Sequence, residues 1–226
     1  MSRLNSQIKK NKVQNKAKFI PFHHLALFDR TYAATKNHEG VVCAMLCVAV
    51  IEAYLNDVEG WYSYVGSTPI MFHEKDRPAN NYLKDEEREF LDKLAKSENK
   101  RFKDKLRVFG VWEESDKLCQ DIDILLKIRN GLTHLKPEEL LICKDTGDFE
   151  GYPKFLNNLF QKKIIQRPKV PMSWIESLES HEFCLWCQEI TYNFTRRLTD
   201  SLLKTTVQSE FAKTAMFKFD ADYYRS

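Results

Sequence analysis

The stretch at residues 39–60, EGVVCAMLCVAVIEAYLNDVEG, constrains the fold most, because it is apolar on nearly every side of a helical wheel. Such a helix has no polar face to offer to solvent, so it must lie inside a core. Its longest unbroken apolar run, eleven residues from Val41 to Ile51, is well short of a bilayer span, which needs about 20 residues. The pattern predicts the central helix of a soluble protein, ending at Gly60, with no membrane partner.

The rest of the chain predicts an all-α bundle of four to six helices in a single domain spanning 1–226. Only 7 Gly and 7 Pro occur among 226 residues, which argues against a turn-rich β fold or a disordered chain. Further helices are expected at 20–38, in the charged region 83–107, at 115–130 with Ser115 as N-cap, and at 180–205 as the final bundle helix.

Two segments stand outside this helical pattern. Residues 137–172 predict an insertion of non-helical or mixed structure, with a strand near 140–143 and a turn around Thr146 and Gly147, and no role follows from their sequence. Residues 1–20 hold six cations and no acid, which favours a solvated N-terminus over an arm that touches phosphates. They show no apolar signal-peptide region either, so we expect a cytoplasmic location. A net charge of +3 does not by itself require a nucleic-acid partner.

The six cysteines predict neither a metal site nor a redox site. Cys184 and Cys187 form a C-x-x-C pair with His181 three residues before it, but no second cysteine pair follows. A structural zinc site requires four suitably placed ligands. The other four cysteines lie among apolar residues and are expected to act as small core side chains. We therefore expect no metal and no cofactor.

The octet KIRNGLTH, residues 127–134, places an arginine on the apolar side of its helix. At 100° per residue, Arg129 falls within about 40° of three apolar positions, Leu118, Ile122 and Leu125. A guanidinium on an apolar face requires an anion. One candidate is Glu52, which is itself on the apolar face of the 39–60 helix, and the other is a phosphate, which arginine binds bidentately.

His134 would lie about 140° away from Arg129 on an unbroken helix. Gly131 weakens the helix, so we expect it to bend or end between 131 and 133 and to let His134 turn toward the arginine. Such a pair suits RNA cleavage: the ribose 2′-OH attacks, His134 acts as acid or base, and Arg129 stabilises the phosphate charge. The spacing alone favours a structural Arg–Glu pair with a helix-terminal histidine, since about 0.3 R-x4-H matches are expected by chance.

Three stretches, taken in their order along the chain, resemble HEPN domains. They are the Glu-bearing apolar helix AMLCVAVIEAYLNDVEG, the charged segment FLDKLAKSENKRFKDKLRVFG, and the octet, which is similar to the R-x4-6-H signature in the form where Asn follows Arg. Together they cover about residues 24–135, and the helix at 180–205 completes the bundle. The resemblance implies a homodimer in which two Arg–His motifs meet across the interface. It also implies a metal-independent endoribonuclease of host defence, toxin–antitoxin systems or RNA processing.

Carried over to this sequence, the resemblance implies catalytic roles for Arg129, His134, Asn130 and Glu52, and we expect RNA contacts from the flanking Lys127 and Thr133. Asn130 would orient the motif, and Glu52 would position the arginine. The implied partners are RNA, a second copy of the chain and a cognate antitoxin or nucleotidyltransferase. Two alternatives remain: a non-catalytic HEPN module for dimerisation or interaction, and an unrelated helical protein in which Arg129 and Glu52 are purely structural.

Overall fold

The computed structural model describes the protein from Phe22 to Ser201, with gaps at 68–84, 86–88, 90–91, 93–100, 109, 136–139 and 148, and without the side chains of 61–67 and Ser201. The basic segment predicted at 1–20 and most of the first part of the charged region at 83–107 lie outside the described residues.

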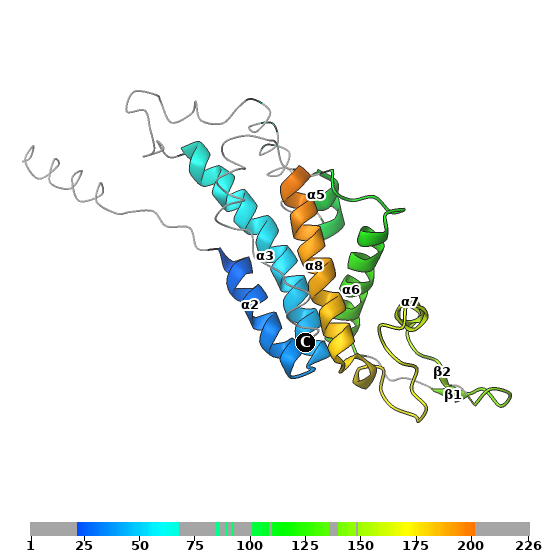
Figure 1. The fold of residues 1–226 in the computed structure, drawn as a ribbon. Helices are drawn as coiled ribbons and strands as arrows, with labels where there is room; N and C mark the ends of the chain where they lie inside the picture. The colour runs from blue at the N-terminus through cyan, green and yellow to red at the C-terminus, as the bar shows by residue number, and fades with distance from the viewer. Residues whose placement is uncertain are drawn as a thin grey trace, which may run out of the picture.

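The described part of the chain is mostly helical, which confirms the all-α class. Four helices form the bundle in Figure 1: α2 (His23–Lys36), α3 (Gly40–Ser67), α6 (Lys117–Thr133) and α8 (His181–Ser201). The remaining described elements are two shorter helices, α5 (Phe102–Val108) and α7 (Leu156–Gln161), a 3-10 helix, η2 (Glu176–Leu178), and two short strands, β1 (Leu141–Ile142) and β2 (Phe149–Glu150).

Helix α3 is the central helix and packs against α2, α6 and α8. It runs parallel to α8, because Gly40 at its start lies against Leu178, just before α8, and the hydroxyl of Tyr54 is hydrogen-bonded to Thr199 near the end of α8. Helices α2 and α6 run in the opposite direction (Figure 1). The apolar stripe expected on the final helix is buried from Phe183 to Leu198. Helix α8 therefore covers the apolar helix α3, as the sequence predicts.

The apolar helix continues past Gly60 to Ser67, so its predicted end at Gly60 is wrong. Gly60 lies inside the helix, with open space where a Cβ would point. A glycine costs a helix only about 1 kcal/mol relative to alanine, and the packing of α3 against three neighbouring helices outweighs that cost. The stretch Gly40–Gly60 is long and apolar enough to cross a membrane by length and composition alone, with 56% of its window buried in the protein. The core helix of a soluble bundle meets the same criteria.

Carboxylates from other elements cap the starts of α2 and α3. Glu179 accepts a hydrogen bond from the Gly40 N–H at 2.7 Å, and Asp57 accepts one from the His24 N–H at 3.0 Å. Both carboxylates satisfy free N–H groups and face the positive end of a helix dipole. Nδ1 of His24 also lies 2.6 Å from the same Asp57 oxygen, and both side chains are buried. These caps lock α2 to α3 and α3 to the start of α8.

Helix α6 begins one position later than predicted, because Asp116 and not Ser115 is its N-cap. The Asp116 carboxylate accepts a hydrogen bond from the Cys119 N–H at 3.0 Å, while the Ser115 hydroxyl donates to Glu113. Nη1 of Arg197, on α8, holds the same carboxylate at 2.5 Å. This arginine lowers the pKa of Asp116 to about 2. A charged cap with a cationic partner thus prevails over the neutral serine.

Four cysteine thiols gather where α3 packs on α8. The thiol of Cys43 interacts with those of Cys47, Cys184 and Cys187, and all four are buried and free. Burial raises the pKa of the Cys187 thiol, whereas metal binding and nucleophilic attack require thiolates. These residues act as small core side chains. Cys143 is partly exposed beside the hairpin turn, so the core position expected for it is wrong.

The segment predicted to have mixed structure, residues 137–172, holds a β-hairpin and α7 in its described part. Strands β1 and β2 are antiparallel, with Ile142 opposite Phe149. Gly147 adopts a φ of +73° in the turn and donates its N–H to the carbonyl of Cys143 at 2.8 Å. The hairpin extends away from the bundle beside the lower end of α6 (Figure 1). The expectation of mixed structure is confirmed for these residues.

Candidate functional site

Helix α6 carries the octet at its C-terminal end and stops at Thr133, with His134 as the C-cap. His134 has φ −131° and ψ 52°, so the helix ends within the predicted interval. Gly131 itself stays helical, so the helix does not break there, and it lies beside two aromatic rings. A Cβ at Gly131 would lie 3.4 Å from the ring of Trp174 and 3.5 Å from that of Phe155. Two aromatic side chains therefore hold the octet in place.

Arg129 and Glu52 form an ion pair between α6 and α3, as their positions on apolar faces predict. Nη2 of Arg129 donates to Oε1 of Glu52 at 2.9 Å, and the two side chains are 31% and 44% exposed. The pair thus lies at the edge of the core, where a ligand can reach it. Nε of Arg129 is buried and has no hydrogen-bond partner among the described residues. Of the five donors of a guanidinium, the described chain engages only one, on Nη2.

The end of the octet is exposed to solvent, including the side chains of Asn130, Thr133 and His134. The Thr133 hydroxyl lies 3.1 Å from the carbonyl oxygens of both Arg129 and Asn130, so it satisfies the helix end. The imidazole of His134 makes no hydrogen bond to any residue that the structure describes, and none joins it to Arg129. Within one chain, the two predicted catalytic groups lie near each other in sequence but are not in direct contact.

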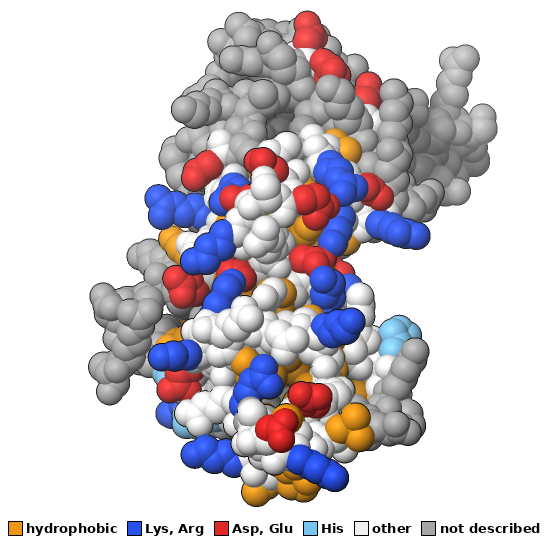
Figure 2. Space-filling view, turned by 90° about the vertical axis from the view of Figure 1, so that its right-hand side faces the viewer, with side chains coloured by type: hydrophobic (Ala, Val, Ile, Leu, Met, Phe, Trp, Pro, Cys, Tyr) orange, Lys and Arg blue, Asp and Glu red, His pale blue; other side chains and the backbone are white. Residues whose placement is uncertain are grey.

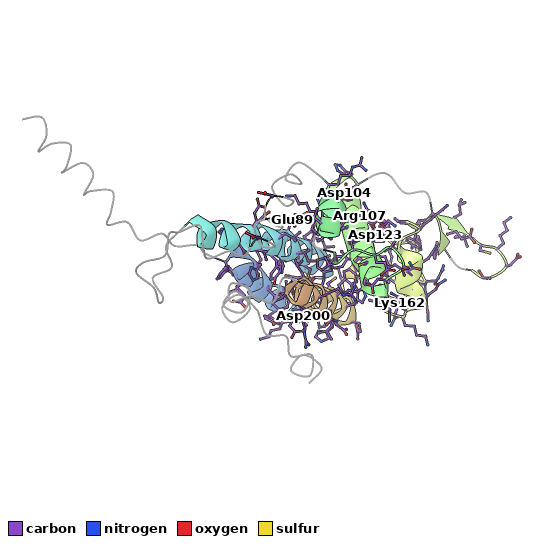
Figure 3. All side chains as sticks on the ribbon, turned by 90° about the horizontal axis from the view of Figure 1, so that it is seen from above. Glu89, Asp104, Arg107, Asp123, Lys162 and Asp200 are labelled. Atoms are coloured by element: carbon purple, nitrogen blue, oxygen red, sulfur yellow. The ribbon has the colours of Figure 1, made fainter. Side chains whose placement is uncertain are left out.

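Lys127, a predicted RNA contact, is 55% exposed and pairs with Asp123 one turn earlier, at 2.7 Å. Asp123 also pairs with Lys103 of α5. Figure 3 shows Asp123 on α6, near the ion pair that Asp104 and Arg107 form within α5. An exposed pair of this kind contributes little to stability, about 0–1 kcal/mol. The Lys127 ammonium can therefore exchange its carboxylate for another anion at small cost.

One face of α3 exposes apolar side chains next to Glu52. Val42 is 45% and Met45 36% exposed, and Leu46 and Ala49 on the same side are partly exposed. A folded protein seldom exposes apolar side chains over successive turns of one helix unless a partner covers them. Because Glu52 lies on the next turn, the apolar face leads directly to the Arg129–Glu52 pair.

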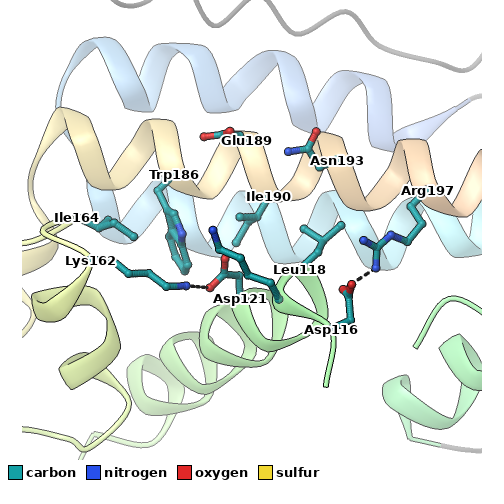
Figure 4. A pocket seen from close by; sticks show the side chains of 11 residues that line it. Asp116, Leu118, Asp121, Lys162, Ile164, Trp186, Glu189, Ile190, Asn193 and Arg197 are labelled. Carbon is teal, nitrogen blue, oxygen red and sulfur yellow. Dashed lines mark hydrogen bonds and ion pairs between the residues drawn. The ribbon is translucent and has the colours of Figure 1, made fainter. Parts of the chain in front are cut away.

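A groove of about 760 Å³ runs between α6, α7 and α8 (Figure 4). Its walls carry two ion pairs, Lys162 with Asp121 and Arg197 with Asp116. The groove is also lined by Lys117 and Glu189, so its three cations are matched by three carboxylates, which disfavours the binding of a further anion there. Neither Arg129 nor His134 lines the groove. Sequence reasoning missed it, because its two halves are far apart in the chain and no local spacing marks it.

Among the residues that the structure describes, no group of three or more His, Cys, Asp or Glu side chains is placed to hold a metal ion. The described chain thus defines an all-α bundle in which an edge Arg–Glu pair, an exposed histidine and an apolar helix face lie at or near the end of one helix. Comparison with known protein families, with curated proteins and with solved structures finds no match.

Proposed function

We propose that the protein is a homodimeric, metal-independent endoribonuclease of the HEPN type, with Arg129 and His134 as its catalytic residues. One observation carries the proposal. Arg129 is held at 31% exposure by a single hydrogen bond to Glu52, at the end of a helix whose cap is an exposed histidine. The remaining Nη donors of Arg129 and the imidazole of His134 make no hydrogen bond to a described residue, so both groups are open to a phosphate.

The chemistry requires only groups that are present at this helix end. The ribose 2′-OH gives up its proton to a base and attacks the adjacent phosphorus. The bond from phosphorus to the 5′ oxygen breaks, and that oxygen takes up a proton. The products are a 2′,3′-cyclic phosphate and a 5′-OH. His134 serves as the acid or base, since imidazole titrates near neutral pH. The free donors of Arg129 stabilise the charge on the phosphate oxygens, while Glu52 positions the guanidinium and Asn130 orients the motif.

The proposal includes a second copy of the chain, seated on the exposed face of α3. The groove formed by the described residues does not include Arg129 or His134. In this proposal, the partner copy supplies the second wall of a cleft at the motif. The exposed Val42 and Met45 lead to the Arg129–Glu52 pair, so a partner on this face brings a second Arg–His motif nearby. Lys127 and Thr133 flank the resulting cleft as RNA contacts.

The cellular setting belongs to the same proposal. Six free cysteines fit the reducing cytoplasm. A cognate antitoxin or nucleotidyltransferase would restrain a toxic ribonuclease, and it could do so by covering the exposed histidine. The second candidate function is a non-catalytic HEPN-type dimerisation module, which the exposed apolar face of α3 favours on its own. The exposed His134, for which the fold provides no hydrogen-bond partner among the described residues, favours the catalytic function.

The experiment incubates the purified protein with mixed single-stranded RNAs in EDTA. Wild type should cut them, and Arg129→Ala and His134→Ala should remain folded but lose about 100-fold or more in rate, the usual contribution of a general acid or base. Arg30→Ala and His23→Ala are the matched controls, because both residues are exposed on α2, and they should cut like wild type. An inert wild type, or cleavage that EDTA abolishes, would overturn the proposal.

A further inference from the structure

The chain between Gly151 and Ile175 is strongly basic. It holds Lys154, Lys162, Lys163, Arg167 and Lys169 and no acidic residue. Because the whole chain carries a net charge of only +3, everything outside this segment is net acidic. The excess of positive charge therefore lies in this segment and in residues 1–20, which are outside the described part of the chain. The proposed catalytic mechanism leaves residues 151–175 without a role. Figure 2 faces the side from which α7 and the hairpin extend and shows Lys and Arg side chains spread over its lower half, with fewer acidic ones among them.

Most of these cations lack a carboxylate partner. Lys154, Lys163 and Lys169 are exposed and form no ion pair with any residue that the structure describes. Arg167 lies over the ring of Phe160, 5.0 Å from its centroid, and likewise has no acid within the described chain. Lys162, labelled in Figure 3, is the exception, because it pairs with Asp121.

Several cations of the bundle are paired instead, although others, such as Arg30 and Lys36 on α2, have no partner among the described residues. A carboxylate lies at short range from each of Lys103, Lys127, Arg107, Arg129 and Arg197. The paired cations stabilise contacts between or along helices. The unpaired cations of the basic segment stabilise no such contact, so their charge is free for an outside anion.

Lys163 also stands in an unusual backbone conformation. Its φ of +57° is in the left-handed region, at the position where α7 ends. Glycine is the residue best suited to such a helix end, because a side chain there is strained. A lysine at this position places an ammonium group on the surface at the expense of backbone strain.

The basic segment is fixed beside the proposed catalytic end of α6. Phe155 and Trp174 lie near the two ends of the segment, their rings pack edge to face, and both lie beside Gly131 of the octet. Farther along the segment, Lys162 at the end of α7 forms an ion pair with Asp121 of α6. The segment therefore follows α6 from Asp121 to Gly131, two residues from Arg129.

We infer that residues 151–175 bind the phosphate backbone of single-stranded RNA and guide it to Arg129 and His134. The choice of RNA as the polyanion rests on the proposed function, whereas the anion-binding surface rests on the charges described above. Flexible lysines without fixed partners suit the sequence-independent contacts that a nuclease makes along a backbone. An acidic polypeptide is the competing occupant, and the experiment separates the two.

Binding is measured by fluorescence anisotropy on the full chain carrying His134→Ala, with a labelled single-stranded RNA of about 20 nucleotides in EDTA, over a series of salt concentrations. The test variant adds Lys163→Gly and Lys169→Gln. Glycine at 163 relieves the backbone strain, so the fold is retained. The matched control adds Arg30→Gln and Lys36→Gln, two exposed cations on α2 without a described partner. Both double variants lose the same net charge.

The test variant should bind at least about tenfold more weakly near 0.1 M salt, and the slope of log K against log salt should fall by about 1.4, or about 0.7 for each lost phosphate contact. The control should bind within about twofold of its parent, and polyglutamate of equal charge should not displace the RNA. Equal weakening of both variants, no weakening of either, or displacement by polyglutamate would overturn the inference. If wild type binds RNA without cleaving it, the inference stands and the proposed ribonuclease activity is contradicted. If wild type cleaves RNA and the test variant binds it as its parent does, the inference is contradicted and the proposed ribonuclease activity stands.

Discussion

Nη2 of Arg129 lies 2.9 Å from Oε1 of Glu52, which joins the end of α6 to the central helix α3 at the edge of the core. The two residues are 77 positions apart in the chain. Each would be an isolated charge on an apolar face without the other, and together they form one partly exposed site. The pair thus supports the local structure while leaving most guanidinium donors for a ligand.

The partial exposure of this pair predicts a small role in stability. Arg129→Ala and Glu52→Gln should each lower the free energy of unfolding by about 1 kcal/mol or less, since exposed ion pairs contribute little. A double-mutant cycle in urea should give a coupling energy of about 0.2–1 kcal/mol. A loss of several kcal/mol in either single variant would make Arg129 a stability residue and would favour the structural interpretation of the octet.

The exposed face of α3 predicts self-association. Met45→Glu places a charge in the proposed subunit interface, so it should shift the protein from dimer to monomer and lower RNA cleavage with it. Ala33→Glu, on the exposed side of α2, is the matched control and should leave both properties unchanged. Light scattering after size-exclusion chromatography reports the mass. A wild-type monomer at all concentrations would contradict the composite cleft.

The cap of α6 predicts a specific acid sensitivity. Because Arg197 lowers the pKa of Asp116 from 3.8 to about 2, the ionised carboxylate stabilises the folded state fully above pH 4. This stabilisation is lost as pH falls from about 4 to 2, and it amounts to at most about 2 kcal/mol before solvent screening. Asp116→Asn should lower the free energy of unfolding at pH 6. It should also reduce the fall in that free energy between pH 4 and 2. The exposed Asp29→Asn should do neither, and an identical acid profile for both variants would refute the cap.

Gly40 and Gly60 of α3 predict opposite effects of the same substitution. A Cβ at Gly40 would lie 1.8 Å from the carbonyl oxygen of Leu178, so Gly40→Ala forces the backbone apart and should cost about 2–3 kcal/mol or more. A Cβ at Gly60 meets nothing within 4 Å, so Gly60→Ala should stabilise the helix by about 0.5–1 kcal/mol. Urea denaturation compares the two variants. Stabilisation by Gly40→Ala would show that α3 and the start of α8 are not tightly packed.

Much of the fold follows from the sequence, because an apolar helix and several amphipathic ones can pack only as a helical bundle. The Arg129–Glu52 pair was predictable for the same reason, since each charge lies on a face that should be apolar. The end of α3 was not predictable, because tertiary packing continues that helix through Gly60. Nor was the cap of α6: Ser115 and Asp116 are both good caps, and Arg197, 81 residues away, decides between them.

The parts of the site that involve the segment 137–172 were also beyond sequence reasoning. The packing of Phe155 and Trp174 on Gly131 joins residues that no periodicity connects. The ion pair between Lys162 and Asp121 spans 41 residues and fixes the basic segment beside α6. Long-range pairs of this kind depend on the three-dimensional path of the chain, whereas local spacing reports only contacts along one helix.

Cleavage of a single-ribonucleotide substrate tests the central claim most directly. In an otherwise deoxy strand, the protein in EDTA should cut only at the one ribose and leave a 2′,3′-cyclic phosphate, identified by mass spectrometry. Replacing that ribose by deoxyribose should abolish the reaction, and so should His134→Ala in the protein. Cutting of the all-deoxy strand, a linear 3′- or 5′-phosphate as the primary product, or full activity in His134→Ala would contradict an attack by the 2′-OH at this site.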